Sequence, residues 1–163
     1  RNGRPMPIVV WRPAAREGGW SSNSDRGKPE NRRLFQGETM RMEQVTEEGI
    51  VRLVDAFYGK VRRDAVIGPV FDKAIGDGWP AHLEKMYGFW SSVMLTTGRY
   101  KGNPVRAHIE VEGIVPPMFQ RWLALFDETA DELFAEQPAN AFCLKARRIG
   151  ESLMLALFYR PTS

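Results

Sequence analysis

The chain has 163 residues, of which 43% are hydrophobic and 26% are charged, a composition typical of one globular domain. Its longest apolar run, 153–159, is far shorter than the roughly 20 residues that cross a bilayer, which excludes a transmembrane protein. A single cysteine, Cys143, excludes an internal disulfide framework, and only two histidines, His82 and His108, exclude a histidine-rich metal cluster. From this cysteine usage we expect a cytoplasmic protein, and from the short apolar runs we expect no membrane partner.

The net charge of +3 is unevenly distributed along the chain. Residues 1–41 hold nine lysines and arginines and four acids, a balance of +5. Residues 42–163 hold fourteen basic and sixteen acidic residues, a balance of −2, and the two balances sum to +3. The basic character therefore belongs to the first segment, and the rest shows no basic face that would predict nucleic-acid binding.

Residues 1–41 differ from the rest of the chain in composition. They are rich in glycine, proline and serine and follow neither the helical nor the strand period, which predicts a disordered or poorly ordered extension. A basic interaction arm is the functional alternative for this segment. We place the boundary after residue 41, so that 42–163 form one folded domain.

From Thr46 onward, apolar residues recur at helical spacing. Thr46 can cap the first helix, and Glu47 and Glu48 suit its positive end. Gly and Pro residues interrupt the pattern, and valines and isoleucines never alternate with polar residues over the length of a strand. We therefore predict an all-α fold with four main helices and two short helical segments. The main helices are expected at about 46–61, 79–97, 117–134 and 139–159, and the short segments at 70–75 and 105–111.

Few features of these segments indicate an enzyme. The sequence has no glycine-rich phosphate loop, no nucleophile elbow and no Cys-x-x-Cys pair. Cys143 lies between apolar neighbours, which favours a buried, inert thiol over a nucleophile.

Four polar ring side chains are the exception. Tyr58, His82 and Trp122 lie on apolar helix faces, and His108 lies in a short segment between loops. Taken singly, each is most simply a structural residue with a hydrogen-bond partner. Together, in a core rich in large flat side chains, they are compatible with a haem pocket that has one histidine ligand and one open coordination position.

Several segments also resemble the group III truncated haemoglobins in order and spacing. The resemblance covers about residues 45–160 and includes the Tyr, His, His and Trp residues named above. The glycine-pair motifs of the other truncated groups are missing from this region, and residues 1–41 have no counterpart in the family. The matching segments are FYGKV at 57–61, GPVF at 68–71, WPAH at 79–82, FW at 89–90, GRYKG at 98–102, AH at 107–108 and FQRWLALF at 119–126.

This resemblance implies a truncated globin helical sandwich that binds haem b without a covalent link. It implies that His108 is the proximal iron ligand and that Tyr58, His82 and Trp122 line the distal side. Arg99, Tyr100 and Lys101 become candidates for contact with the haem propionates. The haem-binding residues expected in all are Phe57, Phe71, Met86, Phe89, Trp90, Arg99, Tyr100, His108, Phe119 and Trp122.

The function implied is binding of O₂, NO, CO or peroxide. Three polar groups beside the ligand predict slow O₂ release. Slow release suits NO oxidation or peroxide reduction better than oxygen transport. Such turnover needs an electron-donating reductase. A haem-based sensor without turnover and a haem-free helical interaction domain are the alternatives.

Overall fold

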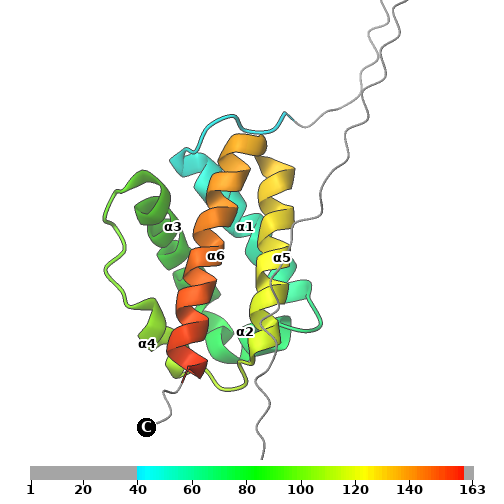
Figure 1. Ribbon diagram of the computed structural model, residues 1–163, viewed down its shortest axis with the longest axis vertical. Helices are drawn as coiled ribbons and strands as arrows, with labels where there is room; N and C mark the ends of the chain where they lie inside the picture. The colour runs from blue at the N-terminus through cyan, green and yellow to red at the C-terminus, as the bar shows by residue number, and fades with distance from the viewer. Residues whose placement is uncertain (1–39, 160–163) are drawn as a thin grey trace, which may run out of the picture. The chain divides into compact units, whose positions relative to one another are not determined.

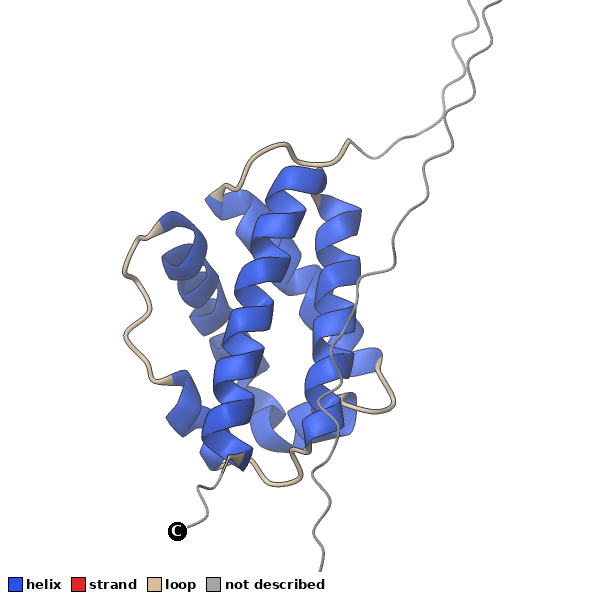
Figure 2. Cartoon of the chain, viewed as in Figure 1, coloured by secondary structure: helices blue, strands red, loops and turns tan. Residues whose placement is uncertain are grey.

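A computed structural model describes residues 40–159, all of which belong to one unit, Glu38–Ser163. The described part is helical and contains no strand, which confirms the predicted all-α class (Figure 2). The predicted disorder of 1–41 falls almost entirely outside the described residues and stays a prediction. The elements are α1 (Glu47–Arg63), α2 (Gly68–Ile75), the 3₁₀ turn η1 (Gly76–Gly78), α3 (Trp79–Leu95), α4 (Pro104–Ile109), α5 (Pro116–Leu133) and α6 (Glu136–Phe158).

Helix α1 forms as its sequence predicts. The hydroxyl of Thr46 accepts a hydrogen bond of 3.0 Å from the backbone N–H of Gly49, so one free donor of the first turn is satisfied. The acids Glu47 and Glu48 lie at the positive end of the helix dipole, and basic residues occupy the last turn. Its apolar stripe is buried, including Phe57 and Tyr58, so the helix is held mainly by this packed face.

Helix ends differ from the prediction by up to three residues, and the clearest cases are α3 and α6. Helix α3 ends at Leu95, two residues early, because Thr96 takes the left-handed conformation with φ of 59°. Helix α6 begins at Glu136, three residues early, and includes Pro138 in its first turn. A proline is tolerated there because the N–H groups of a first helical turn have no partner within the helix.

The helices pack around an aromatic core. Helices α5 and α6 lie side by side, α1 packs behind them against α3 and α5, and α4 packs against α6 (Figure 1). Trp90 stacks on Phe126 with ring centroids 4.7 Å apart, and Trp122 stacks on the same ring at 5.4 Å. Because Trp122 and Phe126 both lie on α5, the stack of Trp90 on Phe126 joins α3 to α5.

No helix within residues 40–159 is long and apolar enough to cross a membrane.

Candidate functional site

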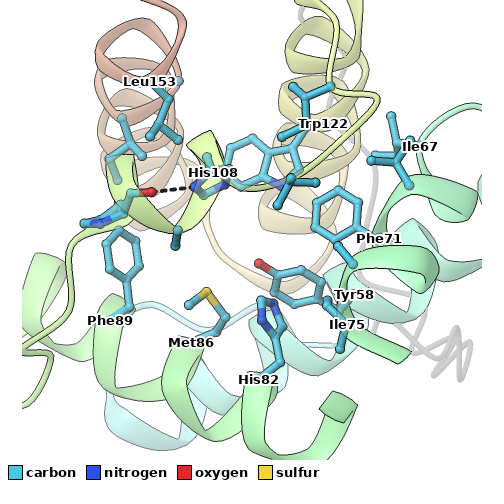
Figure 3. A pocket seen from close by; sticks show the side chains of 18 of the residues that line it. Tyr58, Ile67, Phe71, Ile75, His82, Met86, Phe89, His108, Trp122 and Leu153 are labelled. Carbon is cyan, nitrogen blue, oxygen red and sulfur yellow. Dashed lines mark hydrogen bonds between the residues drawn. The ribbon is translucent and has the colours of Figure 1, made fainter. Parts of the chain in front are cut away.

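A mostly apolar cavity of about 370 Å³ lies between the helices. Every α-helix from α1 to α6 contributes at least one lining side chain, so the whole described fold shapes this space (Figure 3). Its polar lining atoms come from a few residues set among methyl groups and aromatic rings, the usual composition of a ligand pocket. The predicted site residues that line it are Tyr58, Phe71, His82, Met86, Phe89, Trp90, Tyr100, His108, Phe119 and Trp122.

Two residues expected at the haem do not line this cavity. Phe57 precedes Tyr58 on α1 and therefore points about 100° away from it, into the core, where its ring packs edge-on against Trp122 and Phe126. Arg99 lines an adjoining hollow together with Lys101, and its guanidinium lies 3.4 Å from the carboxylate of Glu47. The structure thus places Phe57 behind the site and Arg99 beside it.

His108 is oriented by its own helix. Asn103 caps α4, its side chain accepting a hydrogen bond of 3.1 Å from the N–H of Arg106. One turn back from His108, the carbonyl oxygen of Pro104 lies 2.7 Å from its Nδ1. Because a carbonyl oxygen can only accept, Nδ1 carries the proton in this bond and Nε2 keeps its lone pair. The ring is therefore prepared to bind a metal through Nε2.

Tyr58 supplies a neutral hydroxyl to the cavity. Its side chain is buried, and burial raises the pKa of its phenol well above the usual range, so the group stays protonated at neutral pH. Its hydroxyl points into the cavity (Figure 3) and has no hydrogen-bond partner among residues 40–159. A hydroxyl in this position can donate to a molecule held in the cavity.

His82 lies next to Tyr58, with the two rings edge-on and 5.0 Å apart. Burial, followed by the charges of Lys85 and His108, lowers the pKa of His82 to about 4, so the ring is neutral at pH 7. Its Nε2 is buried and has no hydrogen-bond partner in the described part of the chain. Met86, one turn along α3, lines the same wall.

The residues present fit a haem. No group of three or more histidine, cysteine or acidic side chains in the described residues could hold a bare metal ion. A porphyrin supplies four nitrogen ligands and a flat apolar surface, which matches a cavity lined by Phe71, Phe89 and Phe119. The unpartnered Nε2 of His82 also leaves a polar atom for a ligand beside the iron.

Sequence reasoning missed the wall of the cavity formed by α6. Ile149, Gly150 and Leu153 line it, although the helical period of α6 predicted only that this face is buried. Lys85 was missed as well, and it lines both the cavity and the adjoining hollow. Periodicity separates buried from exposed faces but cannot tell a buried face that meets a neighbouring helix from one that meets a ligand.

Comparison with known proteins identifies the fold and the family. No family model matches the chain. The chain is 32% identical over 122 residues to group 3 truncated hemoglobin ctb of Campylobacter jejuni, a match that covers 73% of this chain and 96% of that protein. The crystal structure of a group III truncated hemoglobin from the same species matches with a TM-score of 0.71 and 31% identity, covering 76% of this chain and all of that one. With this coverage and identity, and with a haem-compatible cavity, the chain belongs to the group III truncated haemoglobins, a family that binds small ligands through haem.

Proposed function

We propose that this chain binds haem b with His108 as the iron ligand, and that it transforms NO or peroxide rather than carrying O₂. The observation that carries the proposal is the arrangement of the cavity. His108 is held by Pro104 with its Nε2 free, and the same cavity is lined by the polar atoms of Tyr58, His82 and Trp122. Bound haem would supply an iron with one open position for O₂, NO or CO.

The proximal residues fix the ligand atom. The hydrogen bond from Nδ1 of His108 to the carbonyl oxygen of Pro104 restrains the imidazole to one tautomer and one orientation. It also makes Nε2 more basic, since a donated proton on the other nitrogen pushes electron density through the ring. Lys85 and Tyr100 line both the cavity and the adjoining hollow, so their side chains are placed to contact the carboxylates of a bound haem.

The opposite side supplies hydrogen-bond donors. The O–H of Tyr58 and the indole N–H of Trp122 both reach a cavity whose walls are largely apolar, where hydrogen bonds are stronger than in water. Each donor contributes about 1 kcal/mol to holding a ligand that accepts, and about 1.4 kcal/mol slows release tenfold. Several donors together therefore favour slow release of O₂.

Slow release favours chemistry on the retained ligand. NO, O₂ and one electron combine to give nitrate, and peroxide with two electrons and two protons gives two waters. Both reactions need an electron donor, so we propose a reductase as partner. The peroxide reaction also consumes two protons, and the neutral His82 and Tyr58 are proton-bearing groups beside the ligand for that step.

Spectra of the purified protein test the proposal. We expect a Soret band in the ferric protein that shifts on reduction with dithionite and again with CO, because the open iron position accepts CO. The His108→Ala variant should lose most of the haem, whereas His82→Ala should keep it, since only His108 has its ligand nitrogen oriented by a backbone carbonyl. The reduced protein in air-saturated buffer should convert NO to nitrate.

Three results would count against the proposal. Lack of a Soret band after addition of hemin would exclude haem binding. A His108→Ala protein with wild-type spectrum and haem affinity would exclude this residue as the ligand. Haem binding without any consumption of NO or peroxide, with a reductant present, would leave a sensor that binds ligands without turnover.

A further inference from the structure

Trp79 occupies the point where α1, α2 and α3 meet, although it does not line the cavity. Its side chain is buried, and its ring lies edge-on to His82 at 5.7 Å and to Tyr58 at 5.9 Å. Because Tyr58 and His82 also contact each other at 5.0 Å, the three rings form a closed triangle. Trp79 is the member of the triangle that stands behind the two cavity residues.

Two surface residues fix the indole from its outer side. The N–H of Trp79 donates a hydrogen bond of 3.1 Å to the carboxylate of Asp72 on α2. The guanidinium of Arg62 on α1 lies over the indole, 4.8 Å from the ring centroid, and 3.8 Å from the same carboxylate. One hydrogen bond, one cation–π contact and one ion pair therefore set the rotamer of a single tryptophan.

His82 needs such support because its own polar atoms do not hold it. Its Nε2 is buried without a hydrogen-bond partner among the described residues, a state that is unfavourable compared with contact with water. Packing contacts are therefore the interactions available to hold the ring at the cavity. The aromatic rings that contact it are those of Tyr58, itself a cavity residue, and Trp79.

We propose that Trp79 is a positioning residue for His82, and that Asp72 acts through Trp79 by holding its indole N–H. The consequence is that the ring of His82 is kept at the cavity, beside an incoming ligand, instead of turning toward solvent. This inference rests on the proposed function only in treating the cavity as the ligand site. It assigns a role to an exposed acid on α2 that contacts neither the cavity nor His82.

A matched pair of variants at Asp72 separates the hydrogen bond from the charge. Asp72→Ala removes the acceptor of the indole N–H, whereas Asp72→Asn keeps an acceptor oxygen and loses only the charge toward Arg62. Trp79→Phe keeps an aromatic ring in the triangle and loses the N–H. Asp77→Ala removes a neighbouring acid of η1 and serves as the control.

The first readout is the rate at which diethyl pyrocarbonate modifies His82 in the purified protein. Peptide mass spectrometry measures it as the loss of the unmodified peptide that contains His82. We expect Trp79→Phe and Asp72→Ala to raise this rate at least about threefold, a coupling typical of residues in contact. Asp72→Asn and Asp77→Ala should leave it unchanged. Equal effects of Asp72→Ala and Asp72→Asn, or no effect of Trp79→Phe, would overturn the inference.

The second readout is the association rate of CO with the reduced protein, measured in a double-mutant cycle with His82→Leu. If Trp79 acts through His82, Trp79→Phe should change the rate at least about threefold in the wild type and by less than about twofold in the His82→Leu background. The same change in both backgrounds would overturn the inference while leaving haem binding intact. The histidine modification needs no haem, so failure of the proposed function would be seen separately.

Discussion

At the scale of single residues, Tyr58 shows how local packing creates a donor. Its phenol lies among Phe57, Phe71 and His82, and this burial keeps the hydroxyl protonated and pointing into the cavity. Within residues 40–159 no protein atom competes for its proton. A ligand that accepts a hydrogen bond is therefore the natural partner of this group.

We predict that Tyr58→Phe speeds O₂ dissociation about fivefold to tenfold, because the loss of one donor costs about 1 kcal/mol. The measurement is displacement of O₂ by CO in a stopped-flow spectrometer. Tyr87→Phe is the matched control, since the hydroxyl of Tyr87 donates to Asp55 outside the cavity, at 2.5 Å. An unchanged rate in Tyr58→Phe would transfer the main donor role to Trp122.

The polar residues of the site could be predicted from the sequence, whereas the residues that pack around them could not. Tyr58, His82, His108 and Trp122 carry polar atoms on apolar stretches, a local signal that survives without knowledge of the fold. Phe57 lies on the same stripe as Tyr58, and only the three-dimensional packing shows that it faces Phe126 instead of the cavity. Trp79 carries the same kind of polar atom, an indole N–H, but the sequence does not show that its partner Asp72 comes from another helix.

At the scale of elements, the connection between α1 and α2 depends on Asp64. One carboxylate oxygen accepts hydrogen bonds from the N–H groups of Val66 and Ile67, at 2.9 and 3.0 Å, and so shapes the start of α2. The other oxygen accepts from the guanidinium of Arg121 on α5, at 2.6 and 2.7 Å. The side chain is 5% exposed, so this carboxylate joins three helices from a nearly buried position.

We predict that Asp64→Asn lowers the free energy of unfolding by about 1 kcal/mol at pH 7, because it removes the negative charge that pairs with Arg121. The loss is no larger because about half of the Arg121 side chain lies in solvent, which screens the ion pair. The bond to Arg121, followed by those from Ile67 and Val66, holds the pKa of Asp64 below its usual range. A lowered pKa stabilises the folded protein above the unfolded value near 4, and this stability is lost as pH falls through the folded value.

Urea unfolding of both proteins at several pH values checks this prediction. The difference between wild type and Asp64→Asn should be largest near neutral pH and should shrink as the pH falls below about 4, where the wild-type carboxylate takes up a proton. A difference that stays constant from pH 7 to pH 3 would mean that the ion pair with Arg121 contributes nothing.

Helix positions followed from apolar period and caps, whereas helix ends and contacts between helices did not. Thr46 and the acids after it located the start of α1, since a cap acts through atoms close in sequence. Leu95 ends α3 where Thr96 turns left-handed, and the loop that follows is tied back to the helix by a hydrogen bond of 2.9 Å from the N–H of Tyr100 to the hydroxyl of Ser92. Such contacts between a loop and its helix leave no periodic trace in a sequence.

At the scale of the whole molecule, the cavity and the fold depend on the same helices. All six α-helices contribute to its lining, and the short helix α4 carries His108 while packing against α6. A group that binds His108 and the opposite walls at once joins α4 to helices on the far side of the cavity. Ligand binding by the folded state alone raises the stability of the entire unit.

We therefore predict that removal of haem lowers the melting temperature by about 10 °C or more, since a ligand at 1,000 times its dissociation constant contributes about 4 kcal/mol. Hydrogen exchange should increase most in α4 and in residues 96–103, the segment that brings Tyr100 to the cavity, because these have fewest other supports. Hemin added back should restore both values in the wild type and fail to do so in His108→Ala. Equal melting temperatures with and without haem would contradict this prediction. They would show that packing in the protein core, which includes the stacked rings of Trp90 and Phe126, stabilises the helices without haem.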